Sequence, residues 1–77
     1  MIIDEIMALT GRDRHSSSLL AVRYLVKDTS YTYDQVSEMT GIKRDPLFAM
    51  WLTADNRMTV KNFLTDYETV RSHFKSQ

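Results

Sequence analysis

A short run of charged residues follows the second of the two glycines in this chain. Ile42 follows Gly41, and the next three residues are Lys43, Arg44 and Asp45. A guanidinium group can donate two hydrogen bonds to guanine, a carboxylate can accept one from cytosine, and lysine binds phosphate. At the start of a helix these three side chains would contact double-stranded DNA. The simpler alternative is a solvated turn for Lys43 and Arg44 and a helix N-cap for Asp45, and for Asp45 we favour the N-cap.

Four more side chains are candidates for the same surface. Arg12 and Arg14 lie in a polar segment, residues 11–15, that we expect to be a loop, and they would bind phosphates together with Tyr33. For Tyr33 we favour burial against the last helix over a phosphate contact. Phe48 would touch a thymine methyl group, anchor a protein partner or pack in the core.

The elements that must position these residues are helices. No segment alternates apolar and polar residues long enough to predict a strand, and one proline and two glycines interrupt the chain. We therefore predict an all-α fold, a small bundle of about five helices. The expected helices cover residues 2–9, 19–28, 33–40, a short segment from 45 and a last one from 59 to 74. The second of these is apolar almost all round, which predicts the central buried element.

The third and fourth helices carry clear end signals. Thr32 and Gln35 have the spacing of a capping box, and Gly41 suits a left-handed turn position. Asp45 is expected to cap the fourth helix, with Pro46 at its first position. Two short helices joined by a glycine turn predict a helix-turn-helix.

Apolar side chains recur at helical spacing on several of these segments, which predicts their buried faces. The second helix would begin after an N-cap from the serines at 16–18, and residues 53–57 would form a connecting loop. Thr59 would cap the last helix. The expected inner residues are Ile2, Ile3, Ile6, Leu9, Val36, Met39, Leu47, Met50, Trp51, Val60, Phe63, Leu64, Tyr67, Val70 and Phe74.

Residues 12–51 resemble the C-terminal DNA-binding domain of the replication initiator DnaA, a Trp-repressor-like fold. The matching features are the apolar helix with Ala21 and Tyr24, then Thr32-Tyr33, Val36-Ser37 and Gly41. Phage Cro- and repressor-type helix-turn-helix proteins share the glycine turn and the inner apolar positions.

The resemblance implies a helix-turn-helix whose basic loop and second helix face DNA. The family follows its turn with an Arg-Asp-His-Ser/Thr signature, and this chain has Lys43-Arg44-Asp45-Pro46 there. Because the histidine and the hydroxyl residues are replaced, we carry over the DNA-facing surface and not the replication role.

Length and composition argue against several other classes of protein. The chain of 77 residues predicts a single domain, 1–77, with ten basic and ten acidic residues and no cysteine. No nucleophile stands beside a base, and the two histidines lack carboxylates at ligand spacing, so we expect no enzyme activity, no metal and no cofactor. No segment is a signal peptide or a membrane span, which predicts a cytoplasmic protein.

Two hypotheses of different classes remain. The first is a sequence-specific binder of double-stranded DNA, a transcriptional regulator of the phage or mobile-element type, with a homodimer as one arrangement. The alternative is a protein-interaction module that inhibits or adapts a host protein and no longer binds DNA. Zero net charge and the loss of the base-reading residues favour the alternative, because DNA-binding domains are usually basic. DNA binding requires the Arg12/Arg14 loop and the Lys43-Arg44 turn to form one continuous positive face, whereas an interaction module would show an exposed apolar patch around Phe48 with acids beside it.

Overall fold

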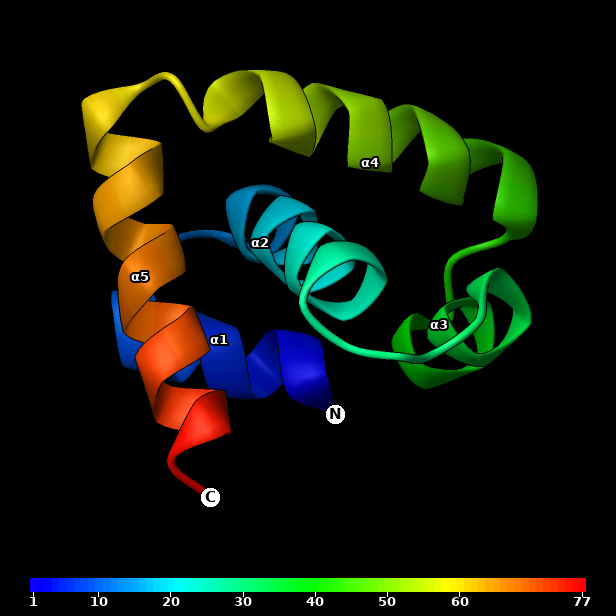
Figure 1. Cartoon of the computed structure of the whole chain (residues 1–77), viewed down its shortest axis with the longest axis horizontal. Helices are drawn as coiled ribbons and strands as arrows, with labels where there is room; N and C mark the ends of the chain where they lie inside the picture. Colours follow the sequence, from blue (N-terminus) through cyan, green and yellow to red (C-terminus); the bar gives the residue numbers. More distant parts are fainter.

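The chain folds into five helices and no strand, which confirms the predicted all-α class. The computed structural model describes all residues, 1–77. Figure 1 shows α4 across one side of the molecule and α5 beside α1, with α2 enclosed between them. The helices are α1 (Ile2–Thr10), α2 (Arg14–Lys27), α3 (Tyr33–Thr40), α4 (Arg44–Arg57) and α5 (Lys61–Lys75).

Helix α2 is the centre of the core, as its apolar sequence predicts. It contacts all four other helices. Leu19, Leu20 and Val22 are at most 1% exposed. Ser17 and Ser18 are buried with them, and their hydroxyls donate to the carbonyl oxygens of Arg12 and Arg14 at 3.4 and 2.7 Å. These hydrogen bonds allow two polar side chains to lie inside the core.

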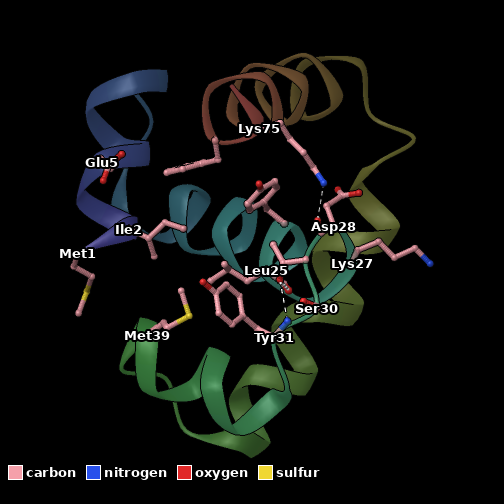
Figure 2. A pocket seen from close by; sticks show the side chains of 13 residues that line it. Met1, Ile2, Glu5, Leu25, Lys27, Asp28, Ser30, Tyr31, Met39 and Lys75 are labelled. Atoms are coloured by element: carbon pink, nitrogen blue, oxygen red, sulfur yellow. Dashed lines mark hydrogen bonds between the residues drawn. The ribbon is translucent and has the colours of Figure 1, made fainter. Parts of the chain in front are cut away.

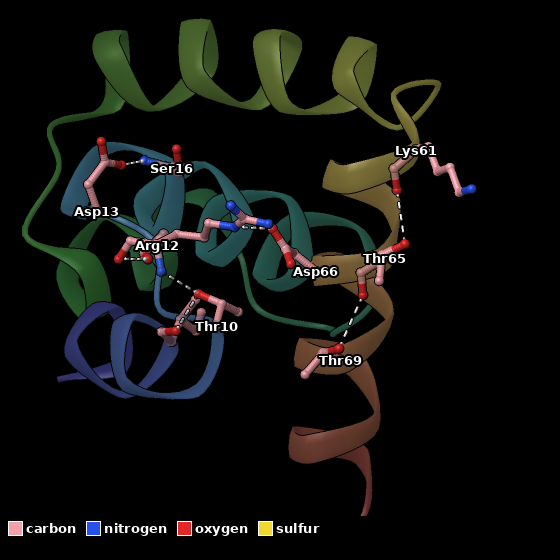
Figure 3. Close-up of polar contacts among 10 residues, drawn as sticks. Thr10, Arg12, Asp13, Ser16, Lys61, Thr65, Asp66 and Thr69 are labelled. Carbon is pink, nitrogen blue, oxygen red and sulfur yellow. Dashed lines mark hydrogen bonds and ion pairs between the residues drawn. The ribbon is translucent and has the colours of Figure 1, made fainter.

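The start of α2 differs from the prediction. The helix begins at Arg14, so residues 14 and 15 are helical and the loop covers only residues 11–13. The N-cap is Asp13, whose carboxylate accepts a hydrogen bond from the backbone N–H of Ser16 at 2.8 Å (Figure 3). An aspartate caps a helix at least as well as serine, and here it precedes the serine run, which therefore lies inside the helix.

The ends of α3 confirm the predicted signals. The Thr32 hydroxyl accepts from the Gln35 N–H, and the Gln35 side chain accepts from the Thr32 N–H, which completes the capping box. Gly41 ends the helix with φ of 73°. Only glycine adopts this left-handed conformation without a steric cost. A tight turn therefore leads directly from α3 into α4.

Helix α4 is longer than predicted at both ends. Its N-cap is Lys43 rather than Asp45, so Asp45 and Pro46 occupy the second and third helical positions. Proline is accepted there because the first N–H groups of a helix have no partner within it. The helix also includes residues 53–57, which were expected to form a loop. Ala54 lies in that segment and is fully buried, so the segment continues the buried side of the helix.

The start and inner face of α5 also need correction. Val60, not Thr59, is the N-cap. Phe63, Tyr67 and Val70 are buried and Phe74 packs against the core, as predicted. Val60 and Leu64 are exposed instead, and Leu9 is also exposed. Val60 is the N-cap and precedes the helix, whereas Leu64 lies roughly 90° around α5 from the buried side chains of Phe63, Tyr67 and Val70. No helix is long and apolar enough to cross a membrane.

Candidate nucleic-acid interface

Helix α4 has one side in the core and one side in water. Leu47 and Ala54 are fully buried, and Met50 and Trp51 pack against the core as predicted. With 3.6 residues per turn, the opposite side of the helix carries a different set of side chains, all of them exposed. We call this set the outer face of α4: Asp45, Phe48, Ala49, Leu52 and Asn56.

The turn before α4 supplies two cations to one end of this face. Lys43 is exposed and forms no ion pair. Arg44 Nη1 lies 3.4 Å from Asp34 Oδ1, and both side chains are largely exposed, at 67% and 78%. An ion pair this exposed contributes little stability, so a phosphate group can replace the aspartate.

Two further cations stand at the other end of α4. Arg57 is its last residue and Lys61 is the first residue of α5, and both are exposed without an ion pair. With 14 residues, the helix is about 21 Å long. Positive charge therefore flanks an outer face that carries only one charged group of its own, Asp45.

An aromatic pair links α3 to the outer face. The rings of Tyr33 and Phe48 have centroids 6.4 Å apart and are tilted by 51°. Tyr33 therefore packs beside α4, and the expectation that it packs against the last helix is wrong. Phe48 is 52% exposed, so it is not a core residue.

The structure places Arg12 and Arg14 away from this surface. Arg12 Nε donates to Asp66 of α5 at 2.7 Å (Figure 3), and Arg14 Nη2 donates to Asp4 of α1 at 2.6 Å. Figure 1 shows the α1–α2 loop beside α5, at the opposite end of α2 from the α3–α4 turn. The two basic pairs singled out in the sequence therefore do not form one continuous positive surface.

A polar network that the sequence did not suggest holds α4 in place. Arg23 of α2 donates to Asp55 of α4 at 3.1 Å and to the Tyr67 hydroxyl of α5 at 2.9 Å. Its guanidinium carbon lies 5.8 Å from the ring centroid of Trp51 and 4.9 Å from that of Tyr67. The Tyr67 hydroxyl in turn donates to Asp28. One arginine thus joins three helices, and no local sequence signal identifies its partners, which lie far along the chain.

The Tyr67 hydroxyl makes the stability of this network depend on pH. Burial raises the pKa of Tyr67 above its ordinary value, and the hydrogen bond to Asp28 raises it further, while Arg23 lowers it. Because the folded-state pKa is the higher one, the stabilisation is complete below about pH 10 and is lost as pH rises toward the folded-state pKa. We expect unfolding midpoints in urea to fall above pH 10, and to fall less steeply in Tyr67→Phe. An equal slope in the two proteins would contradict this.

A surface cleft of about 1010 Å³ lies on another part of the molecule, where α1, the end of α2 and the end of α5 meet. Figure 2 shows Tyr31 and Met39 on one wall and Lys75 reaching across the other. Tyr24 and Phe74 stack at 5.5 Å between ring centroids, and Lys75 donates to the carbonyl oxygen of Asp28 at 3.0 Å. The cleft is separate from the outer face of α4.

Comparison with models of protein families, with curated proteins and with solved structures finds no match to this chain. The residues and geometry of the chain itself, chiefly the turn after α3 and the outer face of α4, are therefore the basis for inferring a function.

Proposed function

We propose that this protein binds double-stranded DNA through α3, the turn at Gly41 and the outer face of α4. The observation that carries the proposal is α4 itself: a helix anchored on one side, exposed on the other and flanked by cations at both ends. The major groove of B-DNA is about 12 Å wide and admits one helix. A helix about 21 Å long can cross it with its ends close to the phosphates.

Each element has a role in the proposed complex. Helix α3 would lie across the sugar-phosphate backbone while α4 enters the major groove, as in other helix-turn-helix proteins. Lys43 and Arg44 at the start of α4, with Arg57 and Lys61 at its end, would bind phosphates. The N-terminal end of a helix also attracts anions through its free N–H groups. Arg12 and Arg14 pair with Asp66 and Asp4 instead, so the continuous positive face expected from the sequence does not form and the proposal rests on the cations of α4 and α5 alone.

The experiment is selection from a pool of random duplex DNA at two salt concentrations. We expect one motif to be enriched and the affinity to fall as salt rises, because bound phosphates release counterions. Lys43→Gln should weaken binding to all sequences and reduce the salt slope by about one. Arg71→Gln is the matched control, because Arg71 is exposed on α5 without an ion pair, and it should bind like the unaltered protein.

No retention of DNA at low salt would overturn this proposal. An equal loss of affinity in Lys43→Gln and Arg71→Gln would overturn the assignment of the surface, because it would show a response to net charge alone.

One observation favours the alternative function, a protein-interaction module. Phe48 and Leu52 are 52% and 48% exposed, one turn apart on the same face, with Asp45 beside them. Such a pair is the anchor pattern of a helix that docks in an apolar groove of a partner protein. If DNA is not retained, we expect Phe48→Ala and Leu52→Ala to abolish binding to that partner, whereas Lys43→Gln would not.

A further inference from the structure

The outer face of α4 lacks the side chains that usually contact guanine. Arginine and lysine make the commonest specific contacts to guanine, and none of the five residues of the outer face is basic. Arg44 stands toward the side of the helix, where it meets Asp34 of α3 at 3.4 Å. The side chains that would meet base edges are chiefly apolar: Phe48, Ala49 and Leu52.

Apolar side chains can distinguish one base from the others in the major groove. Thymine presents its 5-methyl group there, and no other base of ordinary DNA carries an apolar substituent at that edge. We propose that the outer face of α4 recognises thymine through this methyl group. The inference rests on the proposed function and adds to it the class of DNA sequence that is bound.

The arrangement of the three side chains suits this contact. Phe48 and Leu52 lie one turn apart, and the ring of Tyr33 supports Phe48 at 6.4 Å between centroids, so the Phe48 ring is held at the surface. Ala49 between them allows the DNA to approach closely. The cations at both ends of α4 select a polyanion over an uncharged apolar partner. The target is therefore duplex DNA with thymines where α4 enters the groove.

Asn56 extends the same face by one turn beyond Leu52. An asparagine side chain can form two hydrogen bonds with adenine, the partner of thymine. Asp45 at the leading end can accept a hydrogen bond from cytosine. Neither side chain has a hydrogen-bond partner within the protein to hold it away from the groove. The bound sequence is thus expected to have A·T pairs where the apolar side chains and Asn56 meet the groove, and a G·C pair near Asp45.

The test removes only the methyl group from the DNA. In the selected motif each thymine is replaced in turn by deoxyuridine, which leaves base pairing and charge unchanged. At each contacted position we expect about a fourfold loss of affinity, the value for one apolar carbon returned to water. Replacing cytosines outside the motif by 5-methylcytosine is the control and should change nothing.

Two protein variants test which side chains contact the thymine methyl groups. Leu52→Ala and Phe48→Ala should each abolish the preference for thymine over uracil at one position. Lys43→Gln should instead lower the affinity for the thymine-containing and the uracil-containing DNA by the same factor. If a motif is enriched but no deoxyuridine changes the affinity, this inference fails and the proposed function stands. If no DNA is retained, both fail.

Discussion

Replacing Leu47 by alanine is expected to lower the free energy of unfolding by about 2–5 kcal/mol, which is the usual cost of emptying a buried leucine site. Leu47 is fully buried, and it is the residue that anchors the first half of α4 to the core. A domain of this size has a total stability of roughly 5–10 kcal/mol, so a large part of it would be lost. Urea unfolding followed by circular dichroism measures the change.

Leu52→Ala is the matched control, because it makes the same chemical change on the same helix. Leu52 is 48% exposed, so about half of its surface is already in water. We expect a loss of no more than about 1 kcal/mol. Equal losses in the two variants would mean that α4 packs on the core through a different face. The outer face, and with it the proposed DNA contact, would then be wrongly placed.

Arg23→Ala should produce the second large effect, a loss of about 1.5–3 kcal/mol in the free energy of unfolding, the range for hydrogen bonds that involve a charged group. The Arg23 side chain is only 12% exposed and lies against Trp51 and Tyr67. Its removal leaves Asp28 and the Tyr67 hydroxyl with fewer partners and opens space between α2 and α4. Thermal unfolding gives the change in stability.

Arg14→Ala tests whether the environment, rather than the loss of an arginine, causes that effect. The Arg14–Asp4 pair is exposed on both sides, at 61% and 57%, and exposed pairs contribute about 0–1 kcal/mol. We expect the melting temperature of Arg14→Ala to stay close to that of the unaltered protein. If both arginine variants melt at the same reduced temperature, the Arg23 network is not what holds α4 in position.

The effects expected for Leu47→Ala and Arg23→Ala reflect how the candidate site depends on the core. The outer face of α4 presents Phe48 and Leu52 to water, and exposed apolar pairs of this kind often mark interaction sites. They remain at the surface because Leu47 and Ala54 turn the opposite side of the helix inward, and because Arg23 and Asp55 join α4 to α2. Exposed residues of the candidate site and buried anchoring residues thus alternate along a single helix.

The sequence by itself determined the features that depend on neighbouring residues. The Thr32–Gln35 capping box, the left-handed Gly41 and the buried α2 were all predicted, because capping and helical periodicity act over at most a few turns. The local predictions that were wrong concern helix ends, where several neighbouring residues can each serve as the N-cap. Asp13 and the serine run both suit an N-cap, and Lys43 takes the position expected for Asp45.

Only the tertiary structure decided which charged side chains are held in ion pairs within the protein and which apolar residues are exposed. Arg12 and Asp66 are 54 positions apart, and Arg23 and Tyr67 are 44 apart, so no local pattern predicts these pairs. Val60, Phe63 and Leu64 all belong to the apolar stripe predicted for α5, yet only Phe63 is buried. Periodicity indicates the apolar side of a helix, but the packing of the neighbouring helices decides which side chains of that broad side are covered.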